Sequence, residues 1–327
     1  MRMPAGGSAA IRRLAQMVSV VVGIAVVNFF LLHLAPGDAA QVLAGEAGSA
    51  TPEYIAALRA QFGLDQPLGV QFAKYLAKVL TLDLGFSVRQ GLPVAQLILD
   101  RLGPTLLLMG ASLGFAVLAG GALGFVAARH AGRPLDTAIS ALALLFYATP
   151  VFWIGVMLIV VFSVWLDWLP VGGMAEIGTG RTGLAHLGDV LRHLVLPALT
   201  LALYYLAIYT RLTRAAMLEA YGQDYVRTAV AKGVRPRRIA YRHVLRNALL
   251  PVVTQLGLQL GAILGGAVLV ETVFAWPGLG RLAFEALFQR DLNLLLGILL
   301  CSSVVVVLAN LAVDLLYAVL DPRTARA

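Results

Sequence analysis

Long uninterrupted apolar runs restrict this chain to one kind of fold. Several runs approach or exceed 18 residues, which is enough for a helix to cross the roughly 30 Å hydrocarbon layer of a bilayer. The 327 residues are 60% hydrophobic and only 13% charged, whereas soluble domains have about 25% charged residues. The sequence therefore predicts an all-α integral membrane protein whose apolar surface is covered by the lipid bilayer.

Six membrane-spanning helices account for the apolar runs. The expected spans cover residues 14–34, 104–128, 136–166, 196–218, 251–274 and 293–318. The third is over-long and contains Pro150, which predicts a kink or a tilted entry because proline removes a helical hydrogen bond. The first run is longer than the apolar core of a signal peptide and lacks a small-residue cleavage site, so an uncleaved span is expected.

Basic residues collect at the span ends that alternate to one side of the membrane. They are Arg12 and Arg13 before the first span, Arg129 and Arg133 after the second, a longer basic loop after the fourth, and Arg323 after the sixth. The positive-inside rule then predicts that all four clusters and both termini are cytoplasmic. The same rule explains the net charge of +8 without a nucleic-acid partner.

The expected spans divide the chain into three parts. Residues 1–35 form the cytoplasmic N-terminus and first span, residues 36–103 an extracytoplasmic segment, and residues 104–327 a five-helix core. Within the extracytoplasmic segment, Thr51-Pro52 predicts a helix start, and the apolar spacing over residues 68–80 predicts a second, amphipathic helix. This segment is either a packing cap over the first span or a docking site for an extracytoplasmic partner.

The polar loop within residues 219–250 is the most distinctive part of the chain. From Arg211 to Arg246, this loop and its flanks have nine Lys and Arg residues and only two acids. Asp224 is expected to cap a short helix at its N-terminus. Gly233 is expected to end that helix in the left-handed conformation, which glycine adopts without strain. The loop is therefore expected to be structured.

A second helix is expected to lead from this loop back to the membrane. Pro236 suits its first position, and the membrane is reached again at Pro251. Along this helix Arg238, Arg242 and Arg246 recur every four residues and form a basic stripe. Basic residues that only contact lipid phosphates satisfy the positive-inside rule, but they do not require defined helix ends. A lipid contact and a protein-docking element both stay open from the residues alone.

The fifth predicted span has polar residues at two levels. Gln255 and Gln259 share one face, where they either hydrogen-bond a neighbouring helix or line a pathway, since polar groups are costly in lipid. Glu271 near the outer end is expected either to pair with Arg281 or to lie solvated at the interface, or else to contact an amine or cationic substrate or close an outer gate. These three side chains are candidates for the pathway.

The segment after the fifth span is expected to return to the membrane surface. Trp276 is typical of the membrane–water interface, and Pro277 and Gly278 predict a sharp turn. A short interfacial helix is expected over residues 281–290. Trp276, Pro277 and Gly278 are therefore candidates, together with Glu271, for an outer gate.

Sequence motifs for enzymatic chemistry are weak or absent. Gly110-Ala-Ser112-Leu-Gly114 matches the nucleophile elbow of serine hydrolases, but it lies in an apolar helical run and not at the strand-to-helix turn that the elbow requires. The sequence has no Gly-Lys-Ser/Thr loop for ATP, no His-Glu-x-x-His and only one cysteine. No catalytic residue, bound cofactor or metal site is therefore expected in this chain.

Several motifs resemble those of permease subunits of binding-protein-dependent ABC importers, and specifically the dipeptide, oligopeptide and nickel branch. In the basic loop the matching residues are Gln223-Asp224-Tyr225-Val226-Arg227-Thr228-Ala229, Ala231-Lys232-Gly233, His243, Arg246-Asn247-Ala248 and Leu250-Pro251. Elsewhere they are Ala35-Pro36-Gly37-Asp38, Gly63-Leu64-Asp65-Gln66-Pro67, Asp83-Leu84-Gly85, Val270-Glu271-Thr272-Val273-Phe274, Trp276-Pro277-Gly278-Leu279-Gly280 and Leu320-Asp321-Pro322-Arg323. The motifs occur in order over nearly the whole chain.

The resemblance implies a type I ABC importer permease with six transmembrane helices in a bacterial inner membrane, and a small extracytoplasmic helical segment between the first two helices. It also implies three kinds of partner: a second homologous six-helix permease that forms a heterodimer, two cytoplasmic ABC ATPases that use the ATP, and an extracytoplasmic solute-binding protein. The ATPases would bind a coupling helix whose candidate contact residues are Asp224, Tyr225, Arg227, Thr228, Ala229, Lys232, Gly233, Arg237 and Arg238.

The chain departs from the wider importer superfamily in the coupling segment. It has Arg227-Thr228-Ala229 where the superfamily has Glu-Ala-Ala, as is typical of the peptide and nickel branch, and this leaves open whether the glutamate contact is replaced or absent. Peptides are the expected cargo, with nickel complexes and glutathione as alternatives. The alternative function is a self-sufficient secondary transporter or channel, which predicts inverted repeats and several ionisable residues within the membrane. The sequence shows almost none of these.

Overall fold

A computed structural model describes residues 19–30, 51–62, 65–81, 83–87 and 89–320 of the chain. Contacts divide the chain into two units. The first comprises Met1–Leu99 with Ala286–Val307, and the second comprises Asp100–Glu285 with Leu308–Ala327. The N-terminal arginines, the two ends of the first predicted span and the C-terminal basic residues lie outside the described residues.

Both helices predicted within residues 36–103 are confirmed. α3 covers Pro52–Phe62, and the Tyr54 backbone N–H donates to the Thr51 hydroxyl at 3.4 Å, as a capping threonine requires. α4 covers Leu68–Leu80. Its apolar positions recur on one face, so this face packs inward while Gly69 and Lys74 stay exposed.

A further helix, Ser19–Phe30, supplies the partner for that apolar face. Phe29 packs against Phe72 of α4 with ring centroids 5.1 Å apart in an edge-on arrangement, which suits two aromatic rings. A small buried cluster continues this contact through Ala25, Val79 and Leu300. The first unit therefore has its own small apolar core.

A short antiparallel strand pair departs from the all-α prediction. β1 covers Phe86–Ser87 and β2 covers Leu92–Pro93, with Phe86 opposite Pro93 and Ser87 opposite Leu92. The turn between them closes when the Gly91 N–H donates to the Ser87 carbonyl at 2.9 Å. Gly91 has φ +66°, a conformation that glycine adopts without a Cβ clash, and two-residue strands are too short to be recognised from alternation.

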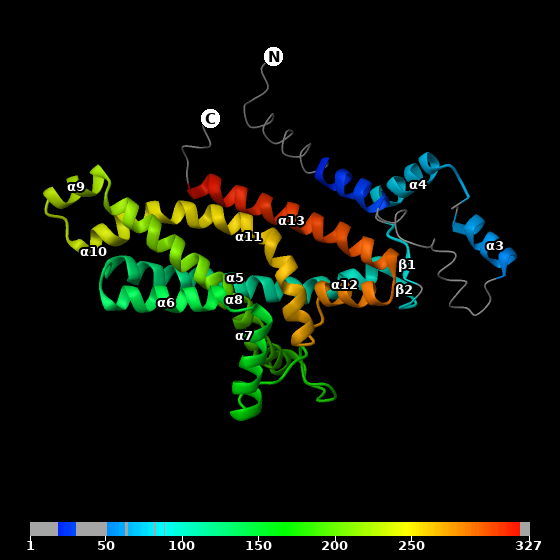
Figure 1. Cartoon of the computed structure of the whole chain (residues 1–327), viewed down its shortest axis with the longest axis horizontal. Coiled ribbons are helices and arrows are strands. Elements are labelled where there is room, and N and C mark those ends of the chain that lie inside the picture. The colour runs from blue at the N-terminus through cyan, green and yellow to red at the C-terminus, as the bar shows by residue number, and fades with distance from the viewer. Residues whose placement is uncertain (1–18, 31–50, 63–64, 82, 88, 321–327) are drawn as a thin grey trace, which may run out of the picture. The chain divides into compact units, whose positions relative to one another are not determined.

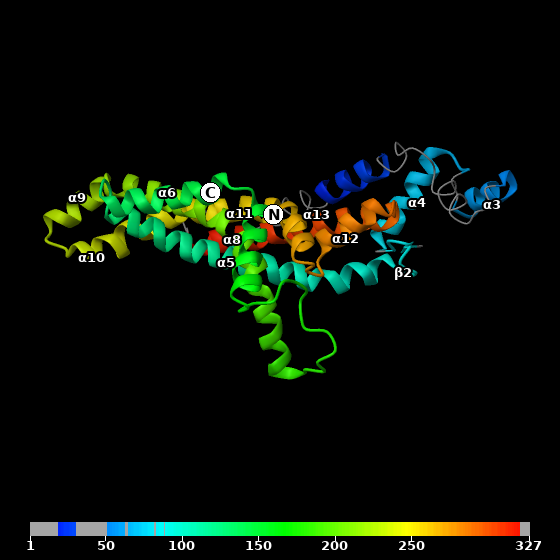
Figure 2. The same cartoon turned by 60° about the horizontal axis from the view of Figure 1, so that its bottom comes forward.

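Helices make up almost all of the remaining chain (Figure 1). In chain order they are α5 (Val94–Arg129), α6 (Pro134–Ala148), α7 (Val151–Leu158), the π-helix η1 (Ile159–Trp165), α8 (Gly183–Tyr221), α9 (Asp224–Ala231), α10 (Pro236–Arg238), the π-helix η2 (Ile239–Leu245), α11 (Arg246–Val273), α12 (Leu279–Phe288) and α13 (Leu292–Leu320). α8 is the centre of the second unit, because α6, α7 and α11 all pack against it. Figures 1 and 2 both show α6 alongside α8.

Several helices are suited to cross a membrane. Among the described residues, Val94–Arg129, Gly183–Tyr221 and Leu292–Ala312 are long and apolar enough, and a fourth span is added if α6 is combined with α7 and η1. The predicted kink at Pro150 is confirmed, and the segment predicted as a span over 136–166 consists of α6 followed by α7 and η1. The chain bends there by 103°, because Thr149 is extended before the proline, as the residue preceding proline prefers.

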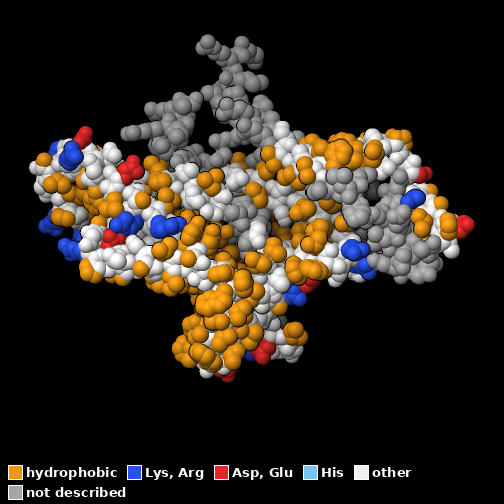
Figure 3. Space-filling view, in the orientation of Figure 1, with side chains coloured by type: hydrophobic (Ala, Val, Ile, Leu, Met, Phe, Trp, Pro, Cys, Tyr) orange, Lys and Arg blue, Asp and Glu red, His pale blue; other side chains and the backbone are white. Residues whose placement is uncertain are grey.

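The segment after this bend has an apolar surface. Phe152, Trp153, Val164 and Trp165 are all exposed, and Figure 3 shows the region of α7 and η1 covered by hydrophobic side chains. Such a surface is costly in water but not in lipid or against another apolar protein surface. The bent segment is therefore suited to a non-aqueous environment.

Two glycines allow α5 and α8 to approach closely. A Cβ at Gly120 would lie 2.7 Å from the Leu206 carbonyl oxygen, and a Cβ at Gly124 would lie 2.7 Å from the Thr213 Cβ. Only glycine fits such a contact between membrane helices. The main apolar core continues from this contact around α8 and α11 and includes the fully buried side chains of Tyr209 and Trp276.

Candidate functional site

The short helix predicted in the basic loop is present as α9, Asp224–Ala231. Gln223 is the N-cap residue, and no side chain caps the helix. The capping role predicted for Asp224 is therefore wrong, because the extended backbone that a cap requires occurs one residue earlier. The Asp224 carboxylate lies in the first turn, where negative charge is favourable, and 3.4 Å from the Arg227 guanidinium.

The C-terminal end of α9 is closed as the sequence predicts. Gly233 has φ +70°, which is the left-handed conformation expected of glycine after a helix. The Gly233 N–H donates to the Val230 carbonyl at 2.9 Å, and the Val234 N–H donates to the Ala229 carbonyl at 3.1 Å. These two bonds form a Schellman motif, so the turn after α9 has a defined geometry.

One face of α9 is anchored on the helices of the second unit. Val226 and Ala229 are 4% and 7% exposed. They pack into a buried group, called here the anchoring cluster, whose other members are Phe125, Ala128, Met217, Ala220, Ile239, Ala240, Val244 and Ala248. These residues come from α5, α8, η2 and α11, so the inner face of α9 belongs to a core that it shares with four other helical segments.

The opposite face of α9 and the turn after it are polar and open. Of the nine predicted ATPase-contact residues, Ala229 alone is buried, while the exposed ones are Asp224, Tyr225, Arg227, Thr228, Lys232, Gly233, Arg237 and Arg238. Figure 3 shows Lys and Arg side chains gathered where Figure 1 labels α9 and α10. The structure therefore brings eight candidates to one accessible surface and places Ala229 in the anchoring cluster.

The path from α9 back to the bundle contains a π-helix that the sequence analysis missed. Pro236 occupies the first turn of α10, as predicted, and η2 then continues without interruption into α11. Arg238, Arg242 and Arg246 are exposed along this path, so the predicted basic stripe is present. π-Helical turns frequently occur at functional sites, but no residue pattern signals this one.

An ion pair near the anchoring cluster was also missed. The Arg214 guanidinium of α8 donates to both oxygens of the Asp136 carboxylate, at 2.6 and 2.8 Å. The Gly132 N–H donates to the same carboxylate at 3.0 Å. A bidentate charged contact fixes orientation as well as distance, so the start of α6 and the turn before it are held against α8. The two residues are 78 positions apart, and no spacing rule connects them.

Glu271 is fully buried at the end of α11 and accepts hydrogen bonds from three groups. The Thr105 hydroxyl donates to one carboxylate oxygen at 2.7 Å, and the Arg281 backbone N–H donates to the other at 2.9 Å. The Gly280 backbone N–H is the third donor. A carboxylate is favourable here, because the first N–H groups of a helix have no partner within it. Glu271 therefore caps the N-terminus of α12.

The predicted pairing of Glu271 with Arg281 involves the backbone and not the guanidinium. The Arg281 side chain instead donates to Glu285 at 2.8 Å and to the Ala275 carbonyl at 2.8 Å. A Cβ added to Gly278 would overlap the Glu271 carboxylate. Glycine at this position is therefore required for the carboxylate to reach α12.

Trp276 is buried, so its predicted position in an interface belt is wrong. Its exposed fraction is 0%, and its indole N–H donates to the Pro104 carbonyl at 3.0 Å. Buried indoles usually find such a partner. The turn predicted at Pro277 and Gly278 is present, and the short helix after it, α12, begins two residues before its predicted start.

Gln255 and Gln259 lie in α11 and are half-buried. Within the described part of the chain, neither amide has a hydrogen-bond partner. The described residues therefore supply no hydrogen bond from either amide to a neighbouring helix. A pathway role stays a prediction for both.

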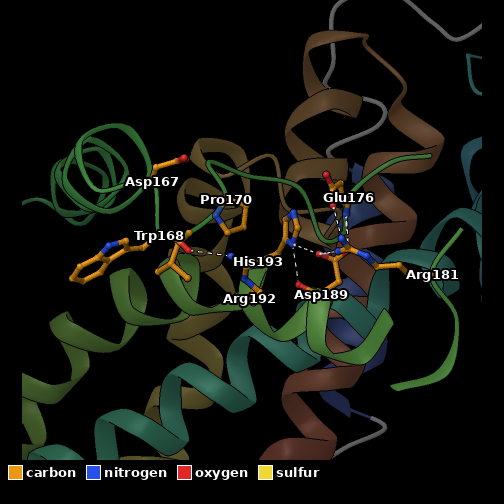
Figure 4. A pocket seen from close by; sticks show the side chains of 9 residues that line it. Asp167, Trp168, Pro170, Glu176, Arg181, Asp189, Arg192 and His193 are labelled. Atoms are coloured by element: carbon orange, nitrogen blue, oxygen red, sulfur yellow. Dashed lines mark hydrogen bonds and ion pairs between the residues drawn. The ribbon is translucent and has the colours of Figure 1, made fainter. Parts of the chain in front are cut away.

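A pocket of about 260 Å³ lies between the segment after η1 and the first turns of α8 (Figure 4). The buried Asp189 carboxylate accepts the Glu176 N–H at 2.8 Å and lies 3.2 Å from the Arg181 guanidinium. The Arg192 guanidinium donates to the Trp168 carbonyl at 3.2 Å. This network attaches the connecting loop to α8, and the sequence analysis did not find it.

The serine of the elbow-like motif is not placed for catalysis. Ser112 lies within α5, its side chain is 0% exposed, and its hydroxyl donates to the Leu108 carbonyl at 2.7 Å. A nucleophile elbow requires an exposed hydroxyl at a strand-to-helix turn. Ser112 therefore has a structural role.

Comparison with protein families matches most of the chain. Residues 120–326 match the family described as binding-protein-dependent transport system inner membrane component. Residues 9–109 match the N-terminal part of the corresponding membrane component. The two matches together cover residues 9–109 and 120–326, which include the whole basic loop.

Relatives of similar length share about two fifths of their residues with this chain. The dipeptide transport system permease protein DppB of Escherichia coli (strain K12) is 39% identical, over 96% of this chain and 97% of that protein. The oligopeptide transport system permease protein AppB of Bacillus subtilis (strain 168) is 40% identical, over 96% of this chain and 98% of that protein.

A solved structure shares the fold. A chain of the MetNI methionine ABC transporter, in inward-facing conformations, matches with a TM-score of 0.56 at 19% identity. The match covers 70% of this chain and 98% of that chain. It shows a common helical arrangement.

Proposed function

This chain belongs to the family of binding-protein-dependent transport system inner membrane components, and we propose that it forms half of the translocation pore of an ATP-driven peptide importer. Two of its relatives are permeases of dipeptide and oligopeptide transport systems, which supports peptides as cargo. Glutathione and nickel complexes are the alternative cargoes. The chain is a membrane subunit without a catalytic site, and ATP hydrolysis belongs to separate subunits.

The proposed architecture is a type I importer permease with six transmembrane helices. Its parts are the N-terminus with the first span (1–35), an extracytoplasmic segment (36–103) and a five-helix core (104–327). The positive-inside rule supports cytoplasmic termini and a cytoplasmic basic loop. A second homologous permease completes the pore as a heterodimer, and the apolar surface of α7 and η1 supports a non-aqueous neighbour there.

The observation that carries the proposal is the anchored position of α9. Its exposed face, together with the turn after it and α10, offers eight exposed candidates to a cytoplasmic ATPase, while Val226 and Ala229 connect the other face of α9 to the pore helices. Moving a two-state equilibrium from 1:99 to 99:1 requires about 5.5 kcal/mol of differential binding. A packed helix with a defined C-terminal end can transmit this difference in binding free energy to the pore helices. A loose loop could change its own conformation instead and leave the pore unchanged.

Glu271 is proposed to hold the outer gate in shape and not to contact the cargo. Its carboxylate is fully buried and occupied by three donors, which leaves little capacity for a substrate amine. Trp276, Pro277 and Gly278 form the turn that this carboxylate supports. Gln255 and Gln259 of α11 are proposed to line the pathway, because neither amide has a hydrogen-bond partner among the described residues.

Reconstitution separates this proposal from a self-sufficient transporter. The permease pair, its ATPases and the binding protein are placed in proteoliposomes, and uptake of a radiolabelled dipeptide is measured. The proposal expects uptake that requires ATP and every subunit, and that stops when the binding protein is withheld. Uptake by this chain alone, driven by an ion gradient, would establish the secondary-transporter alternative.

A further inference from the structure

Arg211 is a cation within a predicted membrane span that has no acidic partner in the described part of the chain. It lies in α8 seven residues before the predicted end of the fourth span at residue 218, or about 10 Å along the helix axis. Its side chain is exposed. Ionisable residues at such positions face a protein interior or a water-filled cavity and usually have a function.

Two tyrosines hold the Arg211 side chain in place. The guanidinium carbon lies 4.4 Å from the ring centroid of Tyr147 in α6. The Tyr147 ring is in turn stacked on Tyr204 of α8, with centroids 5.5 Å apart and an interplanar angle of 13°. A guanidinium over an aromatic face is attracted by the ring quadrupole, so this geometry fixes the cation.

The direction of the side chain excludes simple snorkelling toward the cytoplasmic surface. Snorkelling would extend the guanidinium toward the α9 end of the bundle. Tyr204, however, precedes Arg211 in α8 by about 10 Å, on the side away from α9. Tyr147 is likewise near the end of α6 that is distant from the α5–α6 turn. The guanidinium therefore extends toward the membrane interior, as helical side chains lean toward the N-terminus.

Neighbouring Arg214, unlike Arg211, has an acidic partner within the chain, as an arginine with a purely structural role would. Asp136 accepts two hydrogen bonds from Arg214 and is almost fully buried. Arg211, one turn away on α8, contacts the Tyr147 ring through its guanidinium. Within the described residues its guanidinium N–H groups have no hydrogen-bond acceptor, so they can bind a carboxylate in bidentate geometry.

We propose that Arg211, supported by Tyr147 and Tyr204, binds the C-terminal carboxylate of a peptide during its passage through the pore. The inference rests on the proposed function as a peptide importer. Tyr147 is 42% exposed, so its ring also offers an apolar surface beside the carboxylate. That surface accepts different peptide side chains, while the terminal carboxylate is the group that all unmodified peptides share.

The test compares a dipeptide with its C-terminal amide in the fully assembled transporter. Dialanine and dialanine amide, both radiolabelled, are loaded on the binding protein, and loading is measured by titration. Uptake is then expressed per loaded binding protein, so that selection by the binding protein is removed. Arg211→Gln removes the charge, and Arg211→Lys keeps the charge but loses the bidentate geometry. Arg133→Gln, at an exposed position in the turn between α5 and α6 and outside the predicted spans, is the control.

The expected result is a preference of about tenfold or more for the carboxylate form in the unaltered transporter, which corresponds to one good charged contact. Arg211→Gln should abolish the preference, Arg211→Lys should reduce it, and Arg133→Gln should keep it. An unchanged preference in Arg211→Gln would overturn the inference. So would loss of the second permease from Arg211→Gln, because Arg211 would then be a subunit contact. If the unaltered transporter imports neither compound, the proposed function itself fails.

Discussion

Replacing Val226 by alanine tests whether α9 acts as a rigid part of the bundle. Val226 is 4% exposed within the anchoring cluster. The substitution removes two buried carbon atoms at about 0.8 kcal/mol each, and the cavity left behind brings the loss to about 2 kcal/mol. That loss lowers the ratio of docked to undocked α9 by roughly 30-fold. Val230 is on the same helix but 60% exposed, so Val230→Ala removes the same atoms from an open position.

Hydrogen exchange and transport together decide the outcome. In the purified permease pair, Val226→Ala should raise amide exchange in residues 224–233 by up to roughly 30-fold, while Val230→Ala should change it by less than about threefold. In proteoliposomes, Val226→Ala should import fewer peptides per ATP hydrolysed. Equal exchange in both variants would show that α9 is not docked through Val226. Faster exchange in residues 224–233 with an unchanged number of peptides imported per ATP would show that rigid docking of α9 is not needed to couple the ATPases to the pore.

Three further substitutions test other parts of the account. Gly233→Val should abolish uptake but leave membrane insertion intact, because a β-branched residue is strained at φ +70°; Gly233→Asn, which tolerates that conformation, should retain most uptake in the same assay. Arg214→Asp should impair uptake because it places two carboxylates side by side. Adding Asp136→Arg in the same chain restores opposite charges at the ion pair and should recover part of the uptake. No recovery in the double variant would show that the ion pair does not account for the loss. Gly278→Ala should lower the melting temperature of the purified permease more than Gly110→Ala does. The Cβ added at residue 278 meets the Glu271 carboxylate, whereas the Cβ added at residue 110 meets nothing within 4 Å. Equal shifts would contradict the capping role of Glu271.

The helical elements were largely predictable because their signals are local. Proline at a first helical position, glycine after a helix end and apolar spacing are each visible within a few residues. They gave α3, α4 and the end of α9 at Gly233. The position of Pro150 likewise predicted a kink, because the steric effect of proline on its neighbour does not depend on the rest of the fold.

The contacts of the candidate site were not predictable because they join distant segments. Nothing near Glu271 indicates that Thr105 and the N-terminus of α12 converge on its carboxylate, and nothing near Asp136 indicates Arg214. Tryptophan favours both interfaces and buried sites with a hydrogen-bond acceptor. Trp276 was misplaced because its acceptor, the Pro104 carbonyl, lies on a distant segment. Ala229 belongs to the coupling motif, but only the packing of α9 shows that its side chain faces inward.

Cryo-electron microscopy of the assembled transporter, without nucleotide and with trapped ATP, shows whether α9 joins the ATPases to the membrane helices. Residues 224–238 are expected to contact an ATPase subunit in both states, and α9 is expected to keep its Val226 contact with the anchoring cluster as the two states interconvert. A map in which residues 224–238 lie away from every neighbouring subunit would contradict this expectation.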